Sequence, residues 1–154
     1  MSNFVKSYTT IPKELFRINN GPVVRLRAYP GPRRPPGLFD LLTYAGKVKP
    51  KALSPTTYKA PNGASMRPNT PKTQRLVSTL RGTSACIYSI PAGVRIPDGL
   101  ILVHEFKDHY SLQAGEETTV DALNARITDF LQSKGQCLTK EEWLLQYPKP
   151  TETE

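Results

Sequence analysis

Acidic residues are missing from a long central part of this sequence. No Asp or Glu occurs between Leu41 and Pro97, and the net charge of the whole chain is +8. Residues 1–107 carry 17 Lys and Arg against 4 acidic residues, whereas residues 108–154 carry 4 against 9. Such a basic surface attracts polyanions by counterion release and long-range steering. A nucleic-acid ligand, nucleotide phosphates, an acidic partner protein and a merely solvated face all remain open.

Cysteine is scarce as well. Cys86 and Cys137 lie far apart in the sequence and do not make a disulfide framework, so we expect a reducing compartment. Cys86 falls within an apolar run, where a buried, inert thiol is the favoured interpretation. Together with His104 and His109 these cysteines fit no compact ligand spacing, and no metal site is predicted.

Long apolar runs and the common nucleotide motifs are also absent. No run reaches transmembrane length, and no leader resembles a signal peptide, so we expect a cytoplasmic protein without membrane attachment. The sequence has no P-loop, no Gly-x-Ser-x-Gly elbow and no dinucleotide Gly-x-Gly-x-x-Gly fingerprint. Any nucleotide chemistry must therefore use another type of site.

What is present fits one α+β domain. The 154 residues, 38% of them hydrophobic, suffice for one core, and 15 Pro and 10 Gly imply many turns. We expect a flexible arm at 1–13, a single domain at 14–147 and a solvated tail at 148–154. The periodicity predicts short strands at 14–19, 23–29, 64–67, 85–90, 100–106 and 109–113. It predicts helices at 38–45, at 71–81 and, near the C-terminus, in two capped segments that begin at Thr118 and Thr139.

Two connections in the first half are rich in proline. Residues 30–37 can form a stiff connector or a polyproline ligand for an aromatic groove. Residues 47–60 form a basic loop long enough to be functional or mobile, with Tyr44 and Tyr58 available either to stack bases or to attach the loop to the core.

The segment 61–73 combines a turn, a short extended run and a helix start. Asn62-Gly63 is a turn dipeptide, and Pro71 suits the first helical position after a cap at Asn69 or Thr70. Free N–H groups and the positive end of the helix dipole make this junction a natural anion site. An ordinary capped helix is the alternative interpretation.

Arg17 lies within the first predicted strand between bulky apolar residues. A buried arginine is costly unless it meets an anion or a carboxylate. An edge-strand arginine in water is the other interpretation.

Several segments occur together in an order that is similar to a known family. These are Leu15-Phe16-Arg17, Asn62-Gly63 with Pro68 and Thr70, Ile90-Pro91 with Gly93 and Ile96-Pro97, His109-Tyr110-Ser111-Leu112, and Asp129-Phe130. Over 15–131 the chain resembles the type VI secretion exported toxins that have an ADP-ribosyltransferase-like fold, and their homologues outside bacteria. The resemblance implies a split antiparallel β-core with flanking short helices and a cleft that takes NAD.

The resemblance also implies roles for individual residues. The implied catalytic residues are Ser65, Thr73, His109 and Gln113. The implied NAD-binding residues are Arg17, Arg67, Asn69, Thr70 and Tyr110. The chain departs from the fold's usual signature, because no strand ends in Glu-x-Glu or Gln-x-Glu, and Glu105 is the nearest carboxylate in a strand.

The functional hypothesis is a toxin-like, NAD-dependent ADP-ribosyltransferase that modifies an intracellular macromolecule, either RNA or protein. Because the carboxylate signature is missing, an NAD glycohydrolase is an alternative. A non-catalytic, basic nucleic-acid or ribosome-binding module is another, and so is an interaction protein that docks through residues 30–37. We expect a monomer, with an immunity or antitoxin protein as a further partner.

Overall fold

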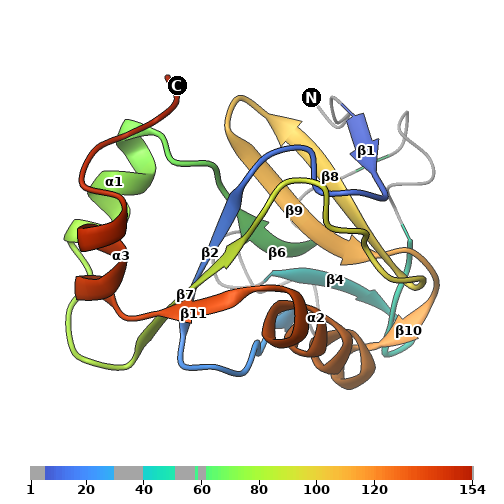
Figure 1. Ribbon diagram of the computed structural model, residues 1–154. Coiled ribbons are helices and arrows are strands. Elements are labelled where there is room, and N and C mark those ends of the chain that lie inside the picture. The colour runs from blue at the N-terminus through green and yellow to red at the C-terminus, as the bar shows by residue number, and fades with distance from the viewer. Residues whose placement is uncertain (1–5, 30–39, 51–57, 59–61, 154) are drawn as a thin grey trace.

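The computed structural model describes residues 6–29, 40–50, 58 and 62–153. Its strands are β1 (Lys6–Tyr8), β2 (Leu15–Asn20), β3 (Ala28–Tyr29), β4 (Leu41–Tyr44), β5 (Lys47–Val48), β6 (Gly63–Met66), β7 (Ala85–Ile90), β8 (Leu100–Phe106), β9 (His109–Ala114), β10 (Thr118–Thr119) and β11 (Gln136–Leu138). Its helices are α1 (Pro71–Ser78), α2 (Val120–Lys134) and α3 (Lys140–Gln146). Figure 1 shows their arrangement.

Two antiparallel sheets form the centre of the molecule. One has the strand order β1-β8-β9-β6, and the other has the order β11-β7-β2. They meet where β2 passes β6, through a bridge in which Phe16 N donates to Arg67 O at 2.7 Å and Arg67 N donates to Phe16 O at 2.9 Å. The predicted α+β class and split antiparallel β-core are therefore confirmed.

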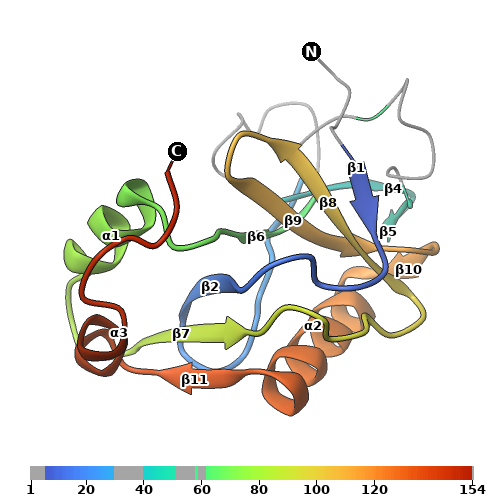
Figure 2. The ribbon, with the colours of Figure 1, turned by 45° about the horizontal axis from the view of Figure 1, so that its top comes forward.

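The first sheet has an apolar face and a polar face. Strand residues alternate between faces, so Leu102 on β8 and its partner Leu112 on β9 both point to the main core. Helix α2 covers this core with Leu123, Ile127 and Leu131 (Figure 2). The polar residues of β6 and β9 consequently point to the opposite face, where the candidate site lies.

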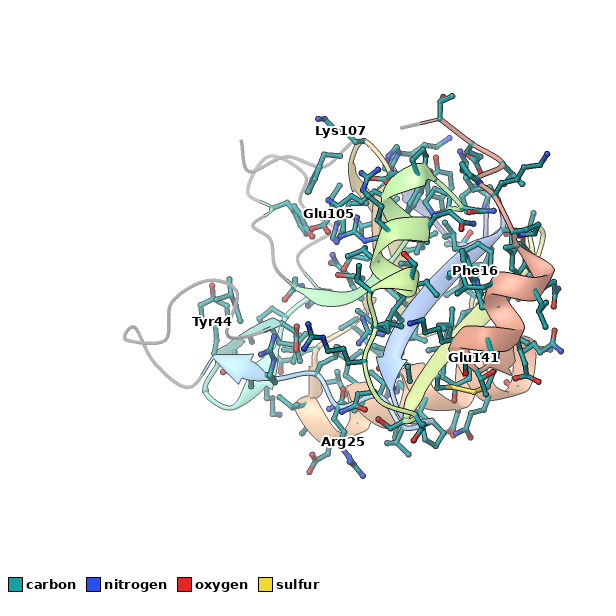
Figure 3. The ribbon with its side chains drawn as sticks, turned by 90° about the vertical axis from the view of Figure 1, so that its left-hand side faces the viewer. Phe16, Arg25, Tyr44, Glu105, Lys107 and Glu141 are labelled. Carbon is teal, nitrogen blue, oxygen red and sulfur yellow. A yellow bond between two sulfur atoms is a disulfide. The ribbon has the colours of Figure 1, made fainter. Side chains whose placement is uncertain are left out.

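A second core holds α1 and α3 against β2 and β7. Phe16 of β2 packs edge-on against Trp143 of α3, with ring centroids 5.3 Å apart, and both side chains are buried. Val77 of α1 and Ile87 of β7 complete the cluster. Figure 3 shows Phe16 beside α3. This packing fixes β2, and therefore Arg17, relative to α1.

Close approach of two strands explains why Gly63 is a glycine. A Cβ on Gly63 would lie 2.4 Å from Leu112 O and 2.7 Å from Ser111 Oγ. No side chain fits there, so glycine at this position allows β6 to pair with β9 and sets the place of Ser65.

The predicted strand at 23–29 is mostly wrong. Only Ala28–Tyr29 pairs with another strand. Val24 and Leu26 are buried as the alternation predicted, but their N–H groups donate to the side chains of Thr128 and Asn124, both at 2.9 Å. Helix α2 therefore satisfies this backbone in place of a sheet.

The predicted helix at 38–45 is also wrong, because Leu41–Tyr44 forms β4. Ala45 and Gly46 both have positive φ, 53° and 76°, and β4 pairs with β5 on either side of them. Two such residues form a hairpin turn, so Gly46 reverses the chain and does not end a helix. Residues 30–37, and most of the basic loop 47–60, lie outside the described residues.

Both termini differ from the expected arm and tail. Strand β1 pairs with β8, and Ile11 is buried at 1% exposure. Near the other end, Asn69 Nδ2 donates to Lys149 O at 3.0 Å, and Lys13 forms an ion pair with Glu152 at 2.8 Å. The described parts of both segments are therefore attached to the domain.

The two cysteines are bonded to each other, contrary to the expected free thiol. Cys86 and Cys137 form a disulfide with a Cα–Cα distance of 5.7 Å. The sequence did not reveal β11, which pairs with β7 and places Cys137 opposite Tyr88, next to Cys86.

The helix caps follow the sequence closely. Thr70 caps α1, and Thr139 with Glu142 forms the predicted capping box of α3. The cap of α2 is Thr119, one residue later than predicted. None of these described helices is long and apolar enough to span a membrane.

Candidate functional site

Three strands bring together a serine, a histidine and a carboxylate. Ser65 Oγ lies 3.0 Å from His109 Nε2, and His109 Nδ1 lies 2.7 Å from Glu105 Oε1. Ser65 of β6 is paired with Ser111 of β9, and His109 lies two residues earlier on the same face. A register shift between His104 and Phe106 brings Glu105, which Figure 3 labels, beside His109 at the end of β8.

Tyr58 holds the carboxylate from its other side. The Tyr58 hydroxyl donates to Glu105 Oε2, and Gln113 Nε2 donates to the Tyr58 oxygen at 2.5 Å. Burial, and then the charge of Glu105, raise the pKa of Tyr58. The hydroxyl therefore stays protonated as a donor, and Glu105, 7% exposed, keeps its orientation toward His109.

Arg17 places a cation beside Ser65, and not all of its nitrogen atoms have hydrogen-bond partners among the described residues. Its Nη1 donates to Ser65 O at 3.3 Å and its Nη2 donates to Asn19 Oδ1 at 3.2 Å. Its Nε is buried without a hydrogen-bond partner among the described residues. Burial lowers the pKa of Arg17, while the Asp40 carboxylate acts in the opposite direction. An arginine nevertheless stays charged in a protein, so this site holds a positive charge.

A cavity opens at the split, between the bridge of the two sheets and α1. Its volume is about 210 Å³, and it is lined by Phe16, Arg17, Ile18, Ser65, Arg67, Leu76 and Leu80. The arginines and the serine thus face a largely apolar space. Cavities for whole drug-sized ligands start at about 300 Å³, so this one is suited to part of a dinucleotide.

The structure brings several of the sequence-predicted residues together. Arg17, Ser65 and Arg67 line the cavity. His109 contacts Ser65, and Gln113 is linked to His109 through Tyr58 and Glu105. Arg67 also faces Asp108, with Nη1 3.8 Å from Oδ1.

Thr70 and Thr73 lie elsewhere, in the first turn of α1. Thr70 Oγ1 donates to Asp108 Oδ2 at 2.9 Å and accepts from Thr73 N at 3.3 Å. Thr73 Oγ1 donates to Pro68 O at 2.7 Å. Both threonines are buried. Both threonine hydroxyls therefore have acceptors within the chain, and the acceptor for Thr70 is the Asp108 carboxylate.

Asn69 and Tyr110 are also outside the cavity. Asn69 Oδ1 accepts from Gln74 Nε2 at 2.9 Å, and its backbone oxygen accepts from two N–H groups of the C-terminal segment. Tyr110 stacks on His104 with ring centroids 4.3 Å apart and points to the other face of β9. Asn69 is thus held by contacts within the chain, whereas Tyr110 also lines a larger cavity at the turn between β8 and β9.

We expect Thr70→Ala and Thr73→Ala each to lower the free energy of unfolding by about 1 kcal/mol, because each removes a buried hydrogen bond. Chemical denaturation measures the change. Turnover per folded molecule should remain near that of the wild type. Loss of turnover in a stable Thr73→Ala protein would contradict this assignment and return Thr73 to the site.

The sequence alone missed the contributions of Glu105 and Tyr58. Glu105 was visible as a strand carboxylate four residues before His109. Only the register shift in the β8–β9 hairpin makes the two meet. Tyr58 reaches Glu105 from a loop 47 residues away in sequence, and no local signal indicates that contact.

The split antiparallel core, the half-buried Arg17 on β2 and the polar contacts of Ser65 and His109 at the split agree with the ADP-ribosyltransferase-like class that the resemblance implies. The family model described as Tse2 ADP-ribosyltransferase toxin matches residues 13–143. The chain belongs to this family, and its class of enzyme is accordingly a transferase that acts as a toxin. No curated protein and no solved structure matches the chain significantly.

Proposed function

We propose that this protein cleaves NAD at the split between β2 and β6 and transfers ADP-ribose to an intracellular macromolecule. The observation that carries the proposal is the half-buried Arg17 guanidinium, whose Nε is buried without a hydrogen-bond partner among the described residues and which shares its cavity with Ser65. A buried polar group without a hydrogen-bond partner is costly. A phosphate or the nicotinamide ribose of NAD would provide Arg17 with the missing acceptor oxygens.

The reaction requires placement of charge more than a strong base. The bond between the nicotinamide nitrogen and ribose C1′ breaks, and its electron pair leaves with neutral nicotinamide. The ribose then carries oxocarbenium character until the acceptor's nucleophile forms a bond to C1′. In the proposed arrangement Arg17 holds the dinucleotide, and Ser65 orients the ribose or the acceptor.

His109 takes the proton that the acceptor loses. Its Nδ1 lies 2.7 Å from Glu105, which stabilises the charged ring, and its Nε2 lies 3.0 Å from Ser65 Oγ on the cavity side. Proton transfer by a positioned histidine contributes about 10²–10⁴-fold to a rate. Glu105 acts through His109 and is therefore a positioning residue.

Hydrolysis of NAD is the second candidate, with water as the acceptor. One observation favours it: the residues that line the described cavity include no carboxylate. A carboxylate at the cavity would have been the natural group to orient a macromolecular nucleophile.

The described part of the loop 47–60 gives little support to the alternative of a non-catalytic nucleic-acid-binding module. Lys47 Nζ lies 3.9 Å from Glu117 Oε2, and Lys49 forms an ion pair with Glu117 Oε1. Because both lysines are already paired within the chain, they are poorer candidates for phosphate binding than the sequence suggested.

NAD labelled separately in its nicotinamide and in its adenylate tests the proposal. With cell extract, we expect release of nicotinamide and adenylate label in protein or RNA. Label recovered only as free ADP-ribose would support hydrolysis and overturn transfer, and intact NAD would overturn both. Ser65→Ala should reduce nicotinamide release at least 10-fold, whereas Ser78→Ala, on the exposed side of α1, should leave it unchanged.

A further inference from the structure

A second, larger cavity lies beside the candidate site. It has a volume of about 710 Å³ at the turn between β8 and β9, and it is bordered by the start of α1 and the C-terminal segment. Its lining includes Lys13, Lys72, Phe106, Lys107 and Glu152. This volume is within the range of cavities that bind whole small ligands.

Phe106 connects this cavity to the candidate site. Its side chain is 54% exposed, although it is a large apolar group. Its ring stacks on His109, with centroids 5.2 Å apart and an interplanar angle of 17°. A molecule bound against Phe106 would therefore be next to His109, whose Nε2 lies 3.0 Å from Ser65 Oγ.

Two of the lysines that line this cavity have no ion-pair partner among the described residues. Lys72 and Lys107 have no ion pair within the described part of the chain, whereas Lys13 is paired with Glu152 at 2.8 Å. Lys107 occupies the tip of the hairpin with φ of 43°, between Phe106 and Asp108. An exposed aromatic ring flanked by two available cations provides both a stacking surface and phosphate ligands.

We propose that this cavity is the subsite for the acceptor, and that the acceptor is a single-stranded nucleic acid. A base stacks on Phe106, and backbone phosphates contact Lys72 and Lys107. The inference rests on the proposed function, and it identifies the substrate class of that reaction. An acidic peptide fits less well, because the carboxylate of Glu152 already neutralises Lys13 and a peptide carboxylate would leave Phe106 without a stacking partner.

Binding of a fluorescein-labelled oligouridylate of about 12 nucleotides, within the span of known single-strand sites, tests the subsite. Phe106→Ala should weaken binding roughly 10-fold. The Lys72→Gln/Lys107→Gln variant should reduce the slope of log affinity against log salt by about 1.4. The control Arg25→Gln/Lys134→Gln removes the same charge from exposed positions and should leave affinity near that of the wild type.

Two further measurements separate this inference from the proposed function. In the Lys72→Gln/Lys107→Gln protein, labelling of nucleic acid should fall at least 10-fold, while nicotinamide release without acceptor stays at the wild-type rate. Unchanged labelling would overturn the acceptor role. Preferential binding of polyglutamate would overturn the choice of nucleic acid. The wild-type protein could also bind the oligonucleotide through Phe106 and yet fail to cleave NAD. That result would overturn both the acceptor role and the proposed function, and the cavity would then be only a nucleic-acid-binding site.

Discussion

An Arg17→Ala protein is expected to lose NAD cleavage by roughly 100-fold or more while keeping its fold. The substitution removes the cation that we assign to the dinucleotide. It also removes the cost of a buried Nε without a hydrogen-bond partner among the described residues. Asn19 keeps its own hydrogen bonds to Gly21 O and Val23 O. Nicotinamide release and thermal unfolding, measured on the same preparation, give both quantities.

Two variants make the Arg17 result specific. Arg17→Lys keeps the charge but loses the planar set of donors, so we expect only partial activity. Arg25→Ala removes an exposed arginine and should leave turnover and melting temperature unchanged. An Arg17→Ala protein that unfolds, or that cleaves NAD at the wild-type rate, would show that Arg17 is a structural residue.

Strands with strong local patterns were predictable from the sequence. The strands predicted at 14–19, 85–90 and 100–106 agree, within one residue, with β2, β7 and β8, because apolar residues over these lengths must be buried whatever their partners are. The turn at Ala45-Gly46 was missed, because a glycine after an apolar run also ends helices. Strand β11 was missed since its three residues form a strand only by pairing with β7.

The candidate site was predictable only in part, for a related reason. Arg17 was recognisable from its strand context, whereas the roles of Ser65 and His109 came from the family resemblance. Their mutual distances depend on the β6–β9 register and on the crossing of β2 over β6. Thr70 and Thr73 were assigned to the site by the family resemblance, and their hydroxyls donate to Asp108 and to Pro68 O.

Glu105→Gln is expected to reduce NAD turnover by about 10²–10⁴-fold, the range attributed to a positioned proton acceptor. In the wild type, the Glu105 carboxylate lies 2.7 Å from His109 Nδ1 and favours the tautomer with its proton on Nδ1, which leaves Nε2 free to accept from Ser65. An amide that donates to Nδ1 would favour the opposite tautomer, in which Nε2 carries the proton and cannot accept one. Nitrogen NMR of the imidazole reports which atom is protonated.

A purely structural role for Glu105 would give a different result. Glu105→Gln keeps the size of the side chain and an oxygen that accepts from the Tyr58 hydroxyl, so stability should change little. Glu105→Ala removes the carboxylate that accepts from the Tyr58 hydroxyl and should cost about 1–3 kcal/mol in unfolding free energy. Glu116→Gln, at an exposed ion pair with Arg126, is the matched control and should affect neither quantity. If the Glu105→Gln protein keeps both the wild-type tautomer of His109 and full turnover, the carboxylate of Glu105 has no influence on the reaction. His109 would then have no role in proton transfer.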